Sequence, residues 1–582
     1  MKKRRVLMII LCALALMALY VFMRRGENAL KNTVPWPVAI TWDEPYVGYV
    51  DLKCFADGYS QYPVKIFLRD DEAAFCLPAF ASGKRIIADF DGKYFEVSID
   101  GNRIGPGDEI LSGASKLDIT YISDAYGRID RSYDLKVMYS GNLPAVFVET
   151  KSGSLEYMDE DKANLDSGYI TCIAPDGADL NNVRIDSMRA KGQSSFTLAK
   201  KNYKVKLQKE TALLGMETGN TWVLLANAMD TSRLWNATAY ELASILGLEG
   251  VVDYRFTDMY FNGEYHGNYM VVQSVDHYFE KHNATDRDSF LLEKETWEER
   301  LKSDAVYIRR DGGVYWEFIF PALPGDEYVK KALFVMDRFE SVTEAACEGN
   351  DLTEFSSVAD ERSFAAKYIL DVLTNEPDSN SHSTFCTYDS LTGKFSMTPV
   401  WDYDRAWGNR PEINRYPFFE SFSHSWPEQM TLNPSYLDLC RRVMEDSSDD
   451  IEALYENGID EMASYIEASW KMDRCVNGGG ISTVTDFEDQ EKNTVFLKAS
   501  FEDIYKDFYD YLNVPDAYAH VYFENREGRA YRIKKGECIP FEVMEYLKKM
   551  YSCDGFVSDG GAFDDNSVVE GDMVVSPMSK GK

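Results

Sequence analysis

The sequence has few of the residues that build metal clusters and disulfide frameworks. It contains six histidines and ten cysteines, with no C-x-x-C pair and no His/Cys group at zinc spacing. The cysteines are scattered singly over 582 residues, which is too sparse for a disulfide scaffold. Zinc-binding modules and disulfide-dense domains are therefore excluded, although the sequence leaves one or two bridges open.

Positive charge is also scarce. Lys and Arg number 62 against 96 Asp and Glu, giving a net charge of −34. Such a surface repels phosphate backbones, so we expect no nucleic-acid partner and a preference for basic protein partners. The sequence also lacks G-x-x-x-x-G-K-[ST] and G-x-G-x-x-G, which excludes the common P-loop and dinucleotide-binding turns.

One long apolar run is present, at the N-terminus. Lys2 to Arg5 precede the uncharged residues Val6 to Met23, and Arg24 and Arg25 follow. Eighteen helical residues span roughly 27 Å, close to the thickness of a bilayer core. We predict a single-pass anchor over residues 1–25 in the cell membrane, with the bulk of the chain extracytoplasmic. Cleavage of this segment as a signal peptide would instead give a secreted protein.

Short-period apolar patterns follow the N-terminal run. From Val38 to Tyr139, strand-like segments alternate with D-G, G-N and G-P-G turns, which predicts an accessory β-sandwich over residues 36–140. Residues 143–513 mix strands with long helices, so the overall fold class is α+β. Residues 514–555 are expected to form a small strand-and-helix appendage, and residues 556–582 a disordered tail.

The stretch from Asn375 to Asn409 carries the strongest chemical signal. A helical run over Phe364–Leu373 leads to a polar loop with Asp378, and a turn at Gly393 predicts a hairpin. A short apolar strand, Met397–Trp401, then ends at Asp402, with Asp404 two residues on. On these residues alone, both carboxylates also fit ordinary loop and strand-end positions.

A loop carboxylate, a hairpin and a strand-terminal Asp are typical of phosphotransferases. In protein kinases the loop Asp accepts the proton of the acceptor hydroxyl, and an Asn five residues later binds metal. Here that position holds Ser383, whose hydroxyl is a shorter ligand. We predict Asp378 as the catalytic base or positioning group, and Asp402, Ser383 and Asp404 as Mg²⁺ ligands. His382 is expected to pack the loop.

Basic residues recur along one predicted strand, K-K-N-Y-K-V-K-L. Alternation places Tyr203 and Val205 on one face and Lys204 and Lys206 on the other. A strand lysine of this kind binds nucleotide phosphates in kinases, and we favour Lys206, with Lys204 or Lys201 as alternatives. A solvated basic strand face is the competing interpretation.

Several of these stretches together resemble the CotH family, the spore-coat-protein-H-like atypical protein kinases. The resemblance is carried by K-G-Q-S-S, W-V-L-L-A-N, F-N-G-E-Y-H-G-N-Y and W-D-Y-D-x-A-W-G-N, in this order between Leu143 and Leu512. It implies a two-lobed kinase-like fold that uses ATP and Mg²⁺ to phosphorylate Ser or Thr of surface or coat proteins, with Ser-rich or basic proteins as the expected substrates.

The resemblance also implies further nucleotide-binding residues. Lys191-Gly192-Gln193-Ser194-Ser195 aligns with the family's R-G-N-S-S, where a turn at Gly192 would aim backbone N–H groups at phosphate, aided by Gln193 and Ser194. Glu241 is the candidate partner of Lys206. It lies on a helix that Thr231 or Ser232 can cap and that Gly247 ends, before a type I′ turn at Asn262-Gly263.

Two positions depart from the family pattern. Ser383 stands for the loop Asn, and Gln273 stands where the family usually has Glu. Because both changes lower the expected activity, a second hypothesis is a membrane-anchored, non-catalytic surface, adhesion or coat scaffold. A third is a carbohydrate-active enzyme with Asp378 and Asp402 as paired carboxylates in an open groove without a facing basic residue.

Overall fold

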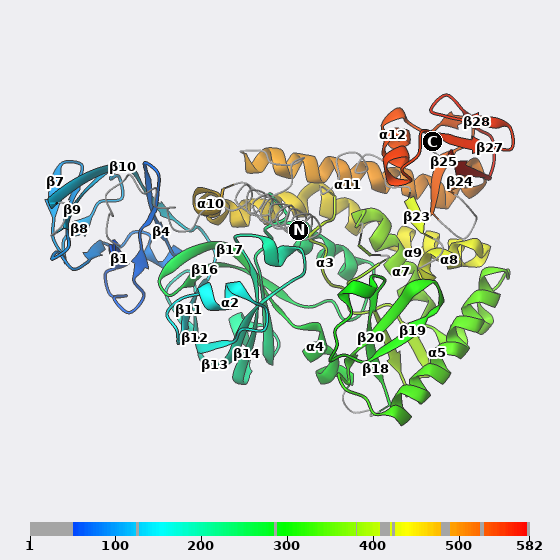
Figure 1. The fold of residues 1–582 in the computed structure, drawn as a ribbon, viewed down its shortest axis with the longest axis horizontal. Coiled ribbons are helices and arrows are strands. Elements are labelled where there is room, and N and C mark those ends of the chain that lie inside the picture. Colours follow the sequence, from blue (N-terminus) through cyan, green and yellow to red (C-terminus); the bar gives the residue numbers. More distant parts are fainter. Residues whose placement is uncertain are drawn as a thin grey trace, which may run out of the picture. The chain divides into compact units, whose positions relative to one another are not determined.

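The computed structural model describes residues 50–123, 127–283, 288–376, 378–379, 381–407, 419–421, 425–478, 489–523 and 529–578. They form two compact units, one with residues 50–75, 84–138 and 191–201, and a larger one with residues 76–83, 139–190 and 202–578 (Figure 1). The predicted anchor, residues 1–25, lies outside the described residues. Within those ranges, no helix is both long and apolar enough to cross a membrane.

The smaller unit is built from two β-sheets, with strand orders β2-β1-β5-β8 and β3-β4-β10-β9-β6-β7. Burial alternates along strands such as β6, which gives each of them one apolar face. The strands are β1 Lys53–Ala56, β2 Val64–Lys65, β3 Phe67–Arg69, β4 Glu72–Leu77, β5 Ile86–Asp89, β6 Phe95–Ile99, β7 Asn102–Ile104, β8 Glu109–Ile110, β9 Lys116–Ser123 and β10 Gly127–Tyr139.

The larger unit begins with a closed seven-stranded barrel, in the order β11-β12-β13-β14-β15-β17-β16. A parallel pairing of β11 with β16 closes it. Asn262 and Gly263 both have positive φ, 52° and 83°, which confirms the predicted type I′ turn between β16 and β17. The strands are β11 Ala145–Thr150, β12 Asp166–Ile173, β13 Asp179–Lys191, β14 Asn202–Thr211, β15 Gly219–Leu225, β16 Tyr254–Phe261 and β17 Glu264–Gln273.

A five-stranded sheet, β19-β20-β18-β21-β22, and a set of helices follow the barrel in the same unit, so the fold is α+β. The strands are β18 Phe290–Glu295, β19 Tyr307–Arg310, β20 Val314–Phe320, β21 Phe385–Asp389 and β22 Lys394–Ser396. The helices are α2 Glu156–Glu160, α3 Trp235–Ile245, α4 Val275–Asn283, α5 Asp326–Cys347, α6 Thr353–Val358, α7 Glu361–Thr374, α8 Trp426–Gln429, α9 Pro434–Ala453, α10 Ile459–Asn477, α11 Gln490–Asn513 and α12 Phe541–Met550.

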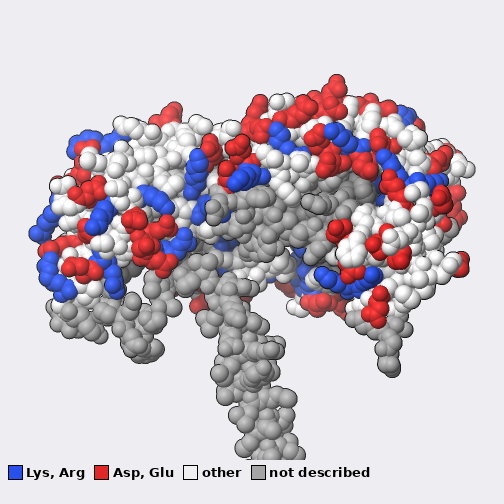
Figure 2. Space-filling view, turned by 90° about the horizontal axis from the view of Figure 1, so that it is seen from above, with Lys and Arg blue, Asp and Glu red and all other residues white. Residues whose placement is uncertain are grey.

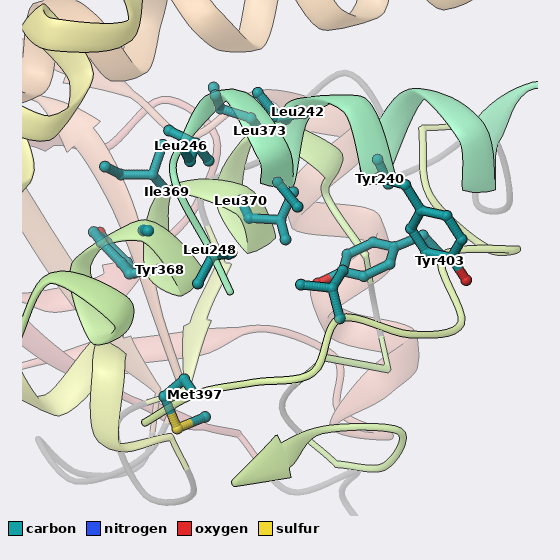
Figure 3. Packing of buried hydrophobic residues seen from close by; sticks show 14 of the residues in the cluster. Tyr240, Leu242, Leu246, Leu248, Tyr368, Ile369, Leu370, Leu373, Met397 and Tyr403 are labelled. Carbon is teal, nitrogen blue, oxygen red and sulfur yellow. The ribbon is translucent and has the colours of Figure 1, made fainter. Parts of the chain in front are cut away.

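Helices α3 and α7 pack together at the centre of the main core. Leu242 of α3 and Leu246, directly after this helix, meet Ile369 and Leu370 of α7, and all four side chains are fully buried (Figure 3). The first turn of α3 is capped by the carboxylate of Asp230, which accepts hydrogen bonds from the N–H groups of Ser232 and Trp235, each 2.7 Å away. The predicted Ser232 also takes part, since its Oγ accepts the N–H of Leu234 at 3.2 Å, whereas the contribution of Asp230 was not predicted.

Two predicted segments differ from the structure, namely the strand before Asp402 and the C-terminal tail. The hairpin β21–β22 is present, but Met397–Trp401 is not a strand, and only Val400 forms an isolated bridge, with Val251. Pro399, in the middle of this segment, has no N–H to donate to a ladder.

The predicted disordered tail is the second difference. Residues 556–577 contain strands that join the appendage in a six-stranded sheet, β23-β25-β24-β30-β27-β28, beside a smaller β26–β29 pair. Strand β30 is fixed by a parallel pairing with β24, which links residues about 50 apart in sequence. The strands are β23 Phe419–Ser421, β24 Tyr518–Phe523, β25 Arg529–Lys534, β26 Glu537–Cys538, β27 Phe556–Ser558, β28 Gly561–Phe563, β29 Val568–Val569 and β30 Met573–Pro577.

Neither the surface charges nor the cysteines of the described residues indicate an additional functional site. On the face drawn in Figure 2, Asp and Glu side chains are spread over the surface with Lys and Arg among them. All nine cysteines within the described ranges are free thiols, and most are buried. The sequence-based expectation of no disulfide scaffold agrees with this.

Candidate active site

The end of helix α7 presents the first two carboxylates of the site. Asn375 ends the helix in the left-handed conformation (φ 48°), and Glu376 and Asp378 follow directly. Glu376 is buried, and its Oε1 accepts the backbone N–H of Asp378 at 3.1 Å. Trp407 ties this corner to the next motif, because its indole N–H donates to the Leu373 carbonyl oxygen at 2.8 Å.

The second pair of carboxylates flanks Tyr403, which is clamped from two sides. Its backbone N–H donates to Asn236 Oδ1 on α3 at 2.8 Å, and its hydroxyl donates to Asp371 Oδ1 on α7 at 3.1 Å. Asp402, just before it, has a φ of 68°, a conformation that costs energy outside glycine. Both clamps therefore hold Asp402 and Asp404 in one fixed backbone geometry.

The four carboxyl groups lie close enough to perturb one another. Burial, followed by the charges of Asp378 and Asp404, raises the pKa of Glu376 well above its usual range. Burial, followed by the charges of Asp402 and Asp378, does the same to the pKa of Asp404. The structure thus brings Asp378, Asp402 and Asp404 together in a single acidic cluster, which we define as these three residues and Glu376.

One cation sits inside the acidic cluster. Nη1 of Arg405 donates to both carboxylate oxygens of Asp378, at 3.0 and 2.9 Å. The backbone N–H of Arg405 donates to Glu376 Oε2 at 3.2 Å. Arg405 thus fixes the position of the Asp378 carboxylate through a charge-assisted hydrogen bond.

Two neighbouring side chains hold the loop that follows Asp378. Ser383 Oγ donates to Asp402 Oδ2 at 2.9 Å, so the predicted metal ligands Ser383 and Asp402 are in direct contact. His382 is buried between Glu295 Oε1 (3.2 Å), Ser381 Oγ (3.1 Å) and the ring of Trp297. These contacts agree with a packing role for His382.

The donor set of the acidic cluster fits Mg²⁺. Among the described residues, no group of three or more His, Cys, Asp or Glu side chains forms a ready-made metal cage. Magnesium, however, commonly takes one or two carboxylates and completes its shell with water and substrate phosphate oxygens. Asp402 and Asp404 supply oxygen ligands of this kind, and their mutual repulsion is what a divalent cation would relieve.

Comparison with known proteins agrees with the family resemblance of the sequence motifs. A family model described as CotH kinase protein matches residues 188–512, more than half of the chain. The chain belongs to the CotH family. A search of curated proteins gives no match.

Within this CotH chain, Lys204 and Lys206, two of the three predicted phosphate-binding lysines, lie on barrel strand β14. Burial alternates as predicted, with Tyr203 and Val205 buried, Lys204 half-buried and Lys206 exposed. Lys204 forms an ion pair with Asp276 at 2.9 Å, whereas Lys206 forms none with a described residue. Binding of phosphate by either lysine stays a prediction.

The predicted ion pair between Lys206 and Glu241 is not formed. Glu241 is exposed on α3 and accepts a hydrogen bond from the hydroxyl of Tyr254 on β16, at 2.8 Å. Strand β14 is separated from β16 by β15 and β17 in the barrel order. The sequence could not show this separation, because it follows from how the barrel closes.

The loop with Gly192, Gln193 and Ser194 belongs to the smaller compact unit. Gly192 has a φ of 117°, and a side chain there would collide with Ser195 Oγ, so the turn requires glycine as predicted. Nζ of Lys201 donates to the carbonyl oxygens of Phe196 and Leu198, at 3.0 and 2.8 Å, and so folds the loop upon itself. The nucleotide-binding role of this loop stays a prediction.

Gln273, the other departure from the family pattern, ends strand β17. Its side chain is buried, and Nε2 donates to the Glu217 carbonyl oxygen at 2.5 Å. An ionised Glu could not donate this hydrogen bond. The replacement therefore has a structural reason in this chain.

A buried ionic network contacts the segment that carries Asp402 and Asp404. Nζ of Lys367 contacts both carboxylate oxygens of Asp371, at 2.5 and 2.6 Å, on the same helix. Lys294 of β18 is also buried, and this burial lowers its pKa to about 7 despite the nearby charge of Glu428. Since Asp371 also accepts the Tyr403 hydroxyl, the network reaches the segment between the two metal-binding candidates.

The sequence-based prediction missed Glu376 and Arg405. Both stand within the motif stretch, Glu376 two residues before Asp378 and Arg405 at the variable position of W-D-Y-D-x-A-W-G-N. A signal was present for Glu376, because a further acid beside a candidate catalytic Asp adds charge to the same site. Arg405 gave no such signal, as its contact with Asp378 joins residues 27 apart.

Proposed function

We propose that this protein is an ATP- and Mg²⁺-dependent protein kinase with a kinase-like two-lobed arrangement, acting on Ser or Thr of surface or coat proteins. The observation that carries the proposal is the acidic cluster, in which Asp378, Asp402 and Asp404 converge around one arginine. Catalysis of phosphoryl transfer consists mostly of positioning and charge neutralisation, which a cluster of this kind can perform.

Each residue then has a defined task. Asp378 accepts the hydrogen bond of the acceptor hydroxyl, orients it towards the γ-phosphorus and takes its proton as the new O–P bond forms and ADP leaves. Asp402 and Asp404 hold Mg²⁺, which when bound neutralises phosphate charge. Ser383 orients Asp402 through its 2.9 Å hydrogen bond. The net charge of −34 favours a basic protein substrate.

We also propose that residues 1–25 anchor the chain in the cell membrane, with the bulk of it extracytoplasmic. Support comes from the apolar run and from the larger number of positive charges before it than after it. A reporter fused after Leu30 would test this orientation, and activity of a cytoplasmic reporter would contradict it.

A non-catalytic scaffold is the second candidate, and one observation favours it. Among the described residues, the ion pair expected between Lys206 and Glu241 is absent, so no carboxylate holds Lys206 in a preformed phosphate-binding position. The carbohydrate-active alternative requires an open groove without a facing basic residue. It is disfavoured because Arg405 donates a hydrogen bond to Asp378.

Transfer of label from γ-labelled ATP separates the two candidates. The full-length protein with Mg²⁺ should label itself or a Ser-rich basic protein, and Asp378→Asn and Asp402→Ala should abolish transfer while keeping the melting temperature. If neither label transfer nor nucleotide binding appeared at millimolar ATP, the non-catalytic scaffold would be the remaining candidate.

A further inference from the structure

Arg405 is the cation within the acidic cluster. Its Nη1 contacts Asp378, and its backbone N–H contacts Glu376. A quarter of the side chain is exposed. Among the described residues, it is the only Lys or Arg that contacts Asp378.

The guanidinium group has hydrogen-bonding capacity beyond these contacts. Arginine carries five N–H donors in a planar fork. Nε of Arg405 is buried and has no acceptor among the described residues, and Nη2 likewise bonds to none of them. Nη2 is not among the buried unpaired atoms, and the side chain is partly exposed, so Nη2 fits a strong external acceptor such as a phosphate oxygen.

Ser383 gives the complementary observation. In protein kinases, the catalytic-loop Asn at this spacing helps to hold a second Mg²⁺. Here the short hydroxyl of Ser383 donates its hydrogen to Asp402 instead, and its backbone has a φ of 53°. The residue thus orients the first metal ligand, which removes one ligand of a second metal site.

We propose that Arg405 contacts the γ-phosphate of the bound nucleoside triphosphate and replaces the second Mg²⁺ of protein kinases, so that the site works with one metal ion and one guanidinium. The inference rests on the proposed function. The reason is electrostatic, because a triphosphate beside four carboxyl groups needs more positive charge than a single Mg²⁺ supplies.

The test compares nucleotide affinities in the full-length protein. Dissociation constants for AMP-PNP and ADP, with Mg²⁺, are measured by calorimetry for wild type, Arg405→Ala and Arg405→Lys. Arg310→Ala is the matched control, since Arg310 is also mostly buried and paired with carboxylates (Asp337 at 2.7 Å) but lies on β19. Bound Mn²⁺ is counted by electron paramagnetic resonance in the presence of AMP-PNP.

We expect Arg405→Ala to lose about 10- to 100-fold in affinity for AMP-PNP while its affinity for ADP is unchanged. Arg405→Lys should keep part of the preference, because it keeps the charge but not the fork. One Mn²⁺ should bind per chain. An unchanged AMP-PNP to ADP ratio in both folded variants, or two bound Mn²⁺ ions, would overturn the inference alone. Failure of wild type to bind either nucleotide would overturn the proposed kinase function as well.

Discussion

Replacing Asn236 by Ala should uncouple the metal-binding candidates from the core. The Asn236 side chain bridges two elements, accepting the Tyr403 N–H at 2.8 Å and donating to Asn227 Oδ1 at 3.0 Å. Asn236 and Asn227 are both nearly completely buried. The variant would leave one donor and one acceptor unpaired, each costing about 1–3 kcal/mol, so we expect a loss of about 2–6 kcal/mol in the free energy of unfolding.

A loss of stability in this variant would not by itself distinguish a side chain that positions the metal ligands from an ordinary buried amide. Because Tyr403 separates Asp402 from Asp404, the variant should also weaken Mg²⁺ binding in the presence of nucleotide by about 10- to 100-fold, as loss of a supporting hydrogen bond commonly does. Urea unfolding gives the first quantity and a Mg²⁺ titration with a fluorescent nucleotide gives the second.

A buried asparagine elsewhere in the same unit provides the control. Asn268 on β17 donates to Ser469 Oγ at 3.0 Å and is fully buried. Asn268→Ala should lower stability without changing the Mg²⁺ dependence. If Asn236→Ala behaved in the same way, the hydrogen bond to Tyr403 would have no part in placing the metal ligands.

Three further predictions concern charged side chains. Burial lowers the pKa of Lys294 to about 7, so between about pH 7 and pH 10 the unfolded chain binds a proton that the folded chain lacks. The free energy of unfolding should therefore rise with pH over this window, by up to about 1.4 kcal/mol per unit, and the rise should be smaller in Lys294→Met. Lys367→Met leaves Asp371 buried without its partner and should cost about 3–5 kcal/mol in urea unfolding, whereas a smaller loss in the double variant with Asp371→Leu would confirm the pairing. Lys206→Ala should leave the melting temperature unchanged, since Lys206 has no ionic partner among the described residues, and should lower ATP affinity only if this lysine binds phosphate.

Local chemistry made much of the fold predictable. Alternation along β14 placed Tyr203 and Val205 inside, and the Asn262-Gly263 dipeptide fixed a turn whose two residues both have positive φ. The helical run before Asp378 and the hairpin after it were also clear, as both follow from periodicity and a glycine turn. These features depend on residues near one another in sequence.

Features that depend on distant partners were not predictable. Glu241 meets Tyr254 rather than Lys206 because the closing order of the barrel separates β14 from β16. Residues 556–577 contain very short strands separated by Gly, Asp and Ser, and these strands pair with the appendage. The contact of Arg405 with Asp378 likewise required α7 and the following motif to fold back on one another.

The central claim is that the acidic cluster and Arg405 bind one Mg²⁺-triphosphate. Calorimetric titration of the full-length protein with ATP, with and without Mg²⁺, tests this most directly. We predict binding that requires Mg²⁺ and disappears in folded Asp402→Ala. ATP binding of equal strength in wild type and Asp402→Ala would contradict the account.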